Sequence, residues 1–182
     1  MTLPAVNPWI AGPAPDVSDV EIPGDGFQIK AHMARPKGVA SAPAVVVIHA
    51  RNGLVPAFRD AADGLASSGY IAVAPDLLSR EGGTDAVDDI AAVLASSPPE
   101  RFSGDAVAVV RWLKAQPEVT RIGIIGFCFG GTVVWRTVTE SPDLAAAVHG
   151  IYGALDDRIN AGIPDISKAL REANVTHALK TY

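Results

Sequence analysis

The sequence is poor in the features that mark secreted and membrane-embedded proteins. Its 182 residues include a single cysteine, Cys128, so no intrachain disulfide can form. The longest strongly apolar run, Ala42–Ile48, is far too short to span a membrane. The N-terminal stretch lacks a basic region and its prolines interrupt any apolar run, so we expect no signal peptide. These absences favour a cytoplasmic protein in which Cys128 is either a nucleophile or an inert core residue.

Basic charge is also scarce. Lysine and arginine number 15 against 20 aspartates and glutamates, which gives a formal net charge of −5. A protein that binds nucleic acid needs a basic face to neutralise phosphates, so we expect no nucleic-acid partner and no membrane partner. The 48% of hydrophobic residues and 19% of charged residues are instead typical of a folded globular domain.

Turn residues and apolar periodicity divide the chain. Met1–Asp16 is proline-rich and predicts an extended arm, followed by a single domain over residues 17–182. Val17–Ile22 and Phe27–Ala34 flank the turn sequence Pro23–Gly26, which predicts a β-hairpin.

Further along, apolar strands alternate with amphipathic helices. This alternation predicts an α/β fold with a mostly parallel sheet and right-handed crossovers. The expected strands are 43–49, 70–74 and 121–125, and the expected helices are 59–67, 84–95, 103–115 and 132–139.

The sequence around Cys128 matches a nucleophile elbow. Gly126-Phe127-Cys128-Phe129-Gly130 lies between a buried strand and a helix, with cysteine where serine is common. The turn is strained, and glycines two residues before and after the nucleophile leave room for it. The helix that follows points its amides at the site, so the Phe129 N–H can help to bind an oxyanion. The alternative is a structural cysteine in a glycine-rich turn.

Four motifs together resemble the dienelactone hydrolase family of the α/β-hydrolase fold. They are VVVIHARNGL, GYIAVAPDLLSREGGT, IGIIGFCFGG and IYGALDDRINAGIP, which begin at Val45, Gly69, Ile122 and Ile151. The resemblance implies a three-layer α/β-hydrolase-like sandwich with an N-terminal β-hairpin. It also implies a hydrolase that opens a lactone or a small carboxylated ester and needs neither a metal nor an organic cofactor.

The resemblance also implies roles for individual residues. Cys128 matches the nucleophile and Asp156 the triad acid, with Asp157 a less favoured neighbour. Phe129 and Arg51 match the oxyanion positions, where they act through their backbone N–H groups. Arg80 matches an arginine that binds the substrate carboxylate, a role that suits the guanidinium fork. An exposed loop arginine is an equally good interpretation of Arg80.

The sequence departs from the family pattern in two side chains. Many members carry a glutamate directly after the strand that ends at His49, whereas this chain has Ala50. The triad histidine of the family lies in a loop after a last strand, which Thr176–Tyr182 matches here. His177 lies inside this strand pattern, so the expected histidine loop is missing.

The third departure concerns spacing. LAAAV from Leu144 and IYGAL up to Leu155 resemble successive family strands, yet only His149 and Gly150 separate them. Parallel neighbours need a crossover of about a dozen residues. Either a connecting segment is missing or only one strand forms, and we expect the domain to be incomplete on its C-terminal side.

Two function classes remain open at this point. The first is an esterase-type hydrolase with Cys128 as nucleophile. The second is a catalytically silent relative that binds a ligand or partner, which the missing histidine and Ala50 favour. Acyl transfer to a thiol is a weaker third possibility. The four histidines show no metal-ligand spacing, and we expect His49 to pack in the core and His32 to be exposed.

Overall fold

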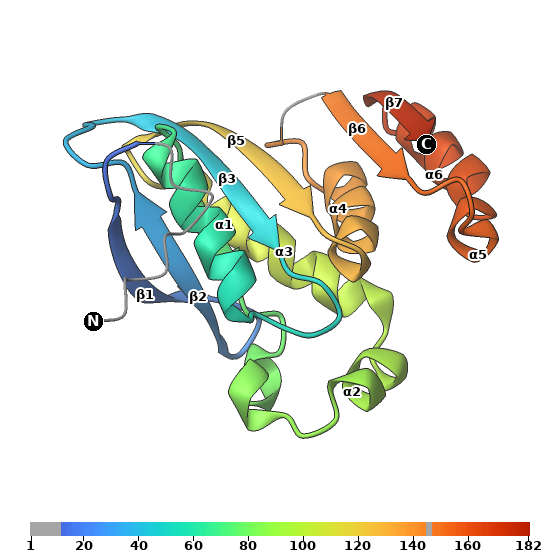
Figure 1. Ribbon diagram of the computed structural model, residues 1–182, viewed down its shortest axis with the longest axis horizontal. Helices are drawn as coiled ribbons and strands as arrows, with labels where there is room; N and C mark the ends of the chain where they lie inside the picture. Colours follow the sequence, from blue (N-terminus) through green and yellow to red (C-terminus); the bar gives the residue numbers. More distant parts are fainter. Residues whose placement is uncertain (1–11, 145–146) are drawn as a thin grey trace, which may run out of the picture.

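A mixed five-stranded sheet forms the centre of the protein, seen in a computed structural model that describes residues 12–144 and 147–182 (Figure 1). Most of the expected N-terminal arm lies outside the described residues. The order of the strands across this sheet is β1-β2-β4-β3-β5, and β6 and β7 form a second, parallel pair. The strands are β1 (Asp16–Pro23), β2 (Gln28–Arg35), β3 (Ala42–Ile48), β4 (Ile71–Pro75), β5 (Val119–Gly126), β6 (Ala147–Tyr152) and β7 (Thr176–Thr181).

Helices cover both faces of the central sheet. Val46 and Ile48 belong to the core beneath the helices on one face, whereas Val47 belongs to the core beneath α1 on the other. This split follows from the two-residue period of a strand and explains why β3 is apolar throughout. The helices are α1 (Pro56–Ser67), α2 (Ile90–Ser96), α3 (Pro99–Lys114), α4 (Phe129–Glu140), α5 (Asp157–Asn160) and α6 (Ile163–Glu172).

The predicted hairpin and parallel centre are confirmed. β1 and β2 pair antiparallel across the Pro23–Gly26 turn, and β3 pairs parallel with both β4 and β5. The expected three layers are therefore present. None of the helices in the described part of the chain is long and apolar enough to cross a membrane.

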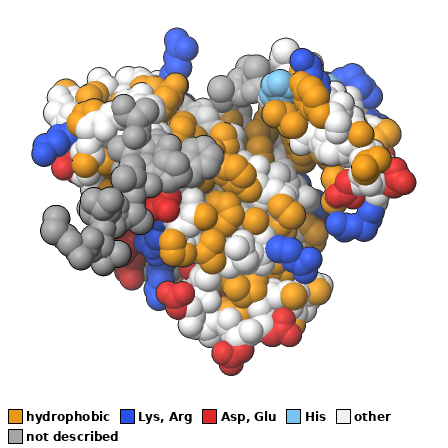
Figure 2. All heavy atoms as spheres, viewed as in Figure 1, with side chains coloured by type: hydrophobic (Ala, Val, Ile, Leu, Met, Phe, Trp, Pro, Cys, Tyr) orange, Lys and Arg blue, Asp and Glu red, His pale blue; other side chains and the backbone are white. Residues whose placement is uncertain are grey.

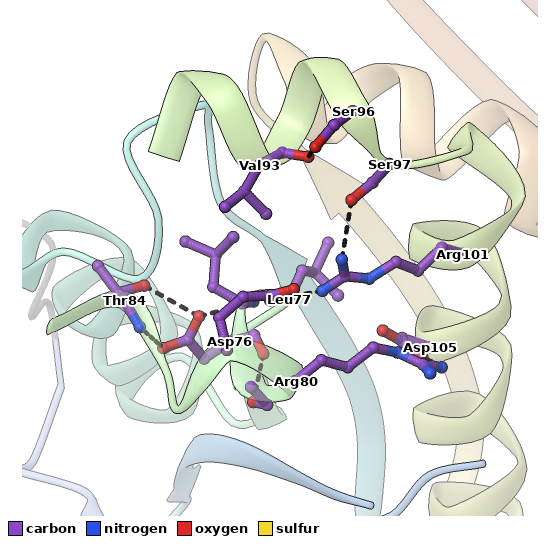
Figure 3. Close-up of polar contacts among 12 residues, drawn as sticks. Asp76, Leu77, Arg80, Thr84, Val93, Ser96, Ser97, Arg101 and Asp105 are labelled. Atoms are coloured by element: carbon purple, nitrogen blue, oxygen red, sulfur yellow. Dashed lines mark hydrogen bonds and ion pairs between the residues drawn. The ribbon is translucent and has the colours of Figure 1, made fainter. Parts of the chain in front are cut away.

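The predicted single helix over residues 84–95 is wrong. The chain forms two short 3₁₀ turns, Ser79–Glu81 and Thr84–Ala86, before α2 begins at Ile90. Asp76 explains the difference, because its buried carboxylate accepts hydrogen bonds from the Thr84 amide (2.6 Å) and hydroxyl (2.9 Å) (Figure 3). Thr84 is thus held by Asp76, in the loop directly after β4, instead of capping a helix, and Asp89 caps α2.

The segment after α4, in which the two expected strands are too close in sequence, forms a single strand. Residues of both expected strands merge into β6, which pairs with β7 and not with β5. Within the described ranges, β5 therefore has a strand partner on one side only, and Ile125 is 37% exposed. A missing crossover leaves a parallel strand without its second neighbour, so the sheet is interrupted between β5 and β6.

The β6–β7 part is attached to the rest through side chains of α4. The Trp135 ring stacks on Tyr152 with centroids 6.5 Å apart and an interplanar angle of 8°. Gly150 makes this approach possible, because a Cβ there would lie 2.7 Å from the Trp135 ring. The contact between the Trp135 and Tyr152 rings thus links α4 to β6, whereas β5 and β6 are not paired as strands.

Candidate active site

Cys128 occupies a strained backbone conformation between β5 and α4. Its φ of 55° and ψ of −111° fall in a sparsely populated region for a residue with a side chain. The flanking glycines have no room for a Cβ: at Gly126 it would strike the Gly130 carbonyl, and at Gly130 it would lie 2.6 Å from two carbonyl oxygens of the β3 end. The geometry is that of the predicted elbow, and it leaves Cys128 exposed.

Phe129 and Arg51, which line the same cavity as Cys128, have backbone amides without a hydrogen-bond partner in the part of the chain that the structure describes. Phe129 is the first residue of α4, so its N–H has no acceptor within the helix. The amide of Arg51, in the turn after β3, likewise has no partner among the residues described. These are the two amides expected at an oxyanion site.

One cleft brings four of the five predicted site residues together. Cys128, Phe129, Arg51 and Asp156 all line a cavity of about 1110 Å³ that separates β5 from β6. Figure 2 shows the surface hollowed between the two parts of the molecule, with hydrophobic side chains gathered beside it. Arg80 is not among the residues that line this cleft.

Asp156 serves as a helix cap. Its carboxylate accepts a hydrogen bond of 3.1 Å from the Ile159 amide at the start of α5, and the side chain is exposed. A triad acid would instead hold an imidazole ring in place. Asp156 therefore lies in the predicted cleft with no histidine as its hydrogen-bond partner.

The described part of the chain shows no histidine bonded to Cys128 or Asp156. His177 lies in β7, where its ring contacts the Ser167 hydroxyl at 2.9 Å and the Val175 carbonyl at 2.9 Å. His149 lines the cleft but is exposed and has no polar partner. The same residues hold no group of three His, Cys, Asp or Glu side chains suited to a metal ion.

His32 corrects an expectation. The sequence predicts an exposed side chain, but His32 is buried and its Nε2 lies 2.7 Å from the Asp63 carboxylate. The position of His32 in the hairpin predicts that it lies in a strand but not what covers the strand. In the structure, α1 packs on the face that carries His32 and supplies Asp63.

Arg80 is engaged away from the cleft. Its guanidinium donates to the Asp105 carboxylate at 3.0 Å and lies 4.2 Å from the centroid of the Phe27 ring (Figure 3). The hydrogen bond to Asp105 raises the pKa of Arg80. Burial raises the pKa of Asp105, a shift that Arg80 only partly opposes. The pair joins the loop after β4 to α3, and carboxylate binding by Arg80 stays a prediction.

His49 lies behind the elbow and is a packing residue, as expected. Its Nδ1–H donates to the Ala50 carbonyl (2.7 Å), and its Nε2 accepts from the Leu77 amide (3.1 Å). Both nitrogens are thus committed in the neutral ring. Burial lowers the pKa of His49, against smaller opposing effects of the Ala50 carbonyl and Asp76.

This arrangement predicts an acid-sensitive fold. The unfolded chain protonates this histidine below a pH of about 6.5, whereas the folded protein keeps it neutral, so stability falls as the pH drops below that value. We expect His49→Gln to reduce the pH dependence of the unfolding free energy between pH 7 and 5, measured by urea titration. His149→Gln, at an exposed histidine, should leave the dependence unchanged; equal slopes in all three proteins would contradict the assignment.

The chain is similar to known proteins of one family. The model of the dienelactone hydrolase family matches residues 29–153, which is more than half of the sequence. The chain belongs to the dienelactone hydrolase family. The matched range includes the elbow and ends just before Asp156, at Gly153. The family resemblance is thereby confirmed, and the matched range contains the first three of the four sequence motifs in full.

Relatives in other organisms agree. A protein of Escherichia coli O157:H7 provisionally named a carboxymethylenebutenolidase is 30% identical over 197 residues, covering 88% of this chain and 73% of the relative. The carboxymethylenebutenolidase homolog of Mus musculus is 33% identical over 132 residues, covering 71% of this chain and 54% of its own. An alignment of 197 positions exceeds the 182 residues of the chain, so the bacterial relative has residues within it that this chain lacks.

Solved structures show the same fold. A crystal structure from Klebsiella pneumoniae, provisionally named a dienelactone hydrolase, superposes with a TM-score of 0.78 at 28% identity and covers 93% of this chain and 85% of its own. Dienelactone hydrolase from Anabaena variabilis gives a TM-score of 0.72 at 18% identity, covering 93% and 86%. The α/β-hydrolase fold expected from the sequence is confirmed.

Sequence reasoning missed the residues that shape the cleft. Trp135 occupies an apolar helical position and packs against the core, and it also lines the cavity and stacks on Tyr152. Helical periodicity identifies an apolar face but not what covers it. The short spacing between Leu144 and Leu155 was the one signal that a neighbouring strand would be absent.

Proposed function

We propose that this protein hydrolyses a carboxylic ester or lactone through a covalent Cys128 intermediate. The Cys128 sulfur forms a bond to the ester carbonyl carbon, and the alkoxide leaves with a proton as the alcohol. Water then attacks the thioester carbonyl, the carbon–sulfur bond breaks, and the acid and the free thiol are released. The amides of Phe129 and Arg51 bind the oxyanion in both steps.

The observation that carries the proposal is the strained, exposed Cys128, which lines one cavity together with two residues whose amides have no hydrogen-bond partner among the described residues. Strain of this kind costs about 1–3 kcal/mol and is found where function requires it. An inert core cysteine would be buried, and it would need neither the positive φ nor the glycines that permit it. Family membership supports the reaction class, and the choice of ester or lactone is open.

A specific observation favours a slower or silent alternative. The described residues supply no imidazole within hydrogen-bond distance of Cys128, and general-base help is typically worth about 10² to 10⁴-fold in rate. Without it the oxyanion site alone leaves a residual rate above that of water. We therefore expect weak hydrolysis that rises with pH, because the thiolate is the attacking species. A scaffold that only binds its ligand would form no acyl-enzyme.

Acylation is the direct test. We expect an activated ester to add one acyl group to the protein, and mass spectrometry after an acid quench should locate it on Cys128. Cys128→Ala should take up none, which excludes background labelling of lysines and serines. Label on Ser79 or Ser103 with Cys128 unmodified would overturn the nucleophile assignment. No label on any residue would favour the binding scaffold.

A further inference from the structure

The cleft beside Cys128 extends well beyond what a small ester needs. We infer that the interrupted sheet forms an acyl-binding trench, so that the preferred substrates are esters of extended, uncharged apolar acids. This inference rests on the proposed function, since it names the substrate class of the same site. It differs from the small carboxylated ester that the family resemblance implied.

The trench has three apolar sides that lead away from the nucleophile. One wall is β5, which recedes from the elbow from Gly126 back to Gly123. The floor is a stripe of α4 that includes Val134, Trp135 and Val138, spaced so that they share one helix face. The other wall is β6, which Figure 1 shows beside β5.

Its length follows from the regular geometry of its walls. Three residues of strand from Gly126 to Gly123 span about 10 Å. Seven residues of helix from Gly131 to Val138 span about 10 Å as well. Two independent elements thus give the same reach, which suits a chain of several methylene groups.

Charge is confined to the end near the nucleophile. The ionised side chains among the lining residues are Arg51, Asp156 and Arg158, which follow the carboxyl ends of β3 and β6. Figure 1 shows the arrows of β3, β5 and β6 pointing the same way, so these ends lie on the side of the molecule where the elbow follows β5. The lining further along β5 and α4 holds no ionised side chain, so it offers nothing to a charged acyl group. An apolar acyl chain bound there would leave water and contact the apolar side chains of β5 and α4.

A series of para-nitrophenyl esters tests the trench. We expect kcat/KM to rise from acetate through butyrate to octanoate, by up to about fourfold for each methylene that becomes buried. Val148→Phe, in the far wall, should lower the ratio of octanoate activity to acetate activity about tenfold. Val119→Phe is the matched control, since Val119 is also a half-buried strand valine that packs on the core but does not line the cleft.

Binding without catalysis separates this inference from the proposed reaction. Calorimetry with Cys128→Ala should show octanamide binding more tightly than butanamide, and Val148→Phe in that background should abolish the difference. Chain-length-dependent binding without hydrolysis by the parent protein would uphold the trench and refute the reaction. Hydrolysis with no preference for longer chains, or equal effects of the two phenylalanine variants, would refute the trench and leave the reaction standing.

Discussion

Replacing Gly130 with alanine should destabilise the protein by about 3 kcal/mol, a large effect for a single methyl group. The new Cβ would lie 2.6 Å from the carbonyl oxygens of Ile48 and His49 and 2.9 Å from the Ile48 side chain. The two oxygens belong to the backbone at the end of β3, so the clash cannot be relieved by a side-chain rotation. Relief would require α4 to move away from β3, and the elbow would move with it.

The neighbouring glycine provides a matched control. A Cβ at Gly131 meets only the Gly126 carbonyl oxygen, at an ordinary contact distance of 3.9 Å. Gly131→Ala should therefore leave the urea unfolding midpoint unchanged or raise it slightly, because alanine favours the helix. Equal midpoints for the two variants would show that the close approach of α4 to β3 is wrong.

The second large effect separates stability from activity. Cys128→Gly should abolish acylation and ester hydrolysis, because the attacking sulfur is gone. The same change should raise the unfolding free energy by about 1 kcal/mol, because glycine adopts a φ of 55° without strain, less the entropy that glycine loses on folding. Activity and stability would then move in opposite directions, as expected for strain stored at a functional residue.

Cys128→Ala distinguishes the two causes. Alanine removes the thiol but keeps the Cβ and therefore the strain, so this variant should lose activity without gaining stability. Rates from para-nitrophenyl acetate and midpoints from urea unfolding give both quantities. A gain in stability for alanine equal to that for glycine would mean that the backbone at residue 128 is unstrained.

The elbow was predictable because its cause is local. The apolar end of a strand, glycines two residues to either side of Cys128 and the start of a helix all lie within ten consecutive residues, although β5 is less buried than the sequence predicted. The tight packing at Gly126 and Gly130 gives the physical reason for that spacing. The paired strands β1 and β2 were predictable for the same reason, since the turn sequence lies between them.

Other features depend on residues outside the local motif. Thr84 is predicted as a helix cap but is bound by Asp76 in the loop after β4. Arg80, for which substrate binding and an exposed loop position were equally good interpretations, pairs with Asp105 of α3. Local propensity cannot anticipate a buried carboxylate that arrives from another element. The same limit applies to His32, whose partner Asp63 lies on α1.

The sequence by itself determined the fold class and the family, and it located the elbow that holds Cys128, because these follow from apolar periodicity and from contiguous motifs. It also indicated that a connecting segment or a strand is missing from the sheet, since two residues cannot connect parallel neighbours. Only the tertiary structure showed how the chain is arranged around this interruption. β6 pairs with β7 and leaves β5, Trp135 stacks on Tyr152 across the gap, and a cleft opens beside Cys128. The sequence alone does not fix which strand edges pair or which side chains meet across such a gap. Both depend on how distant elements pack against one another.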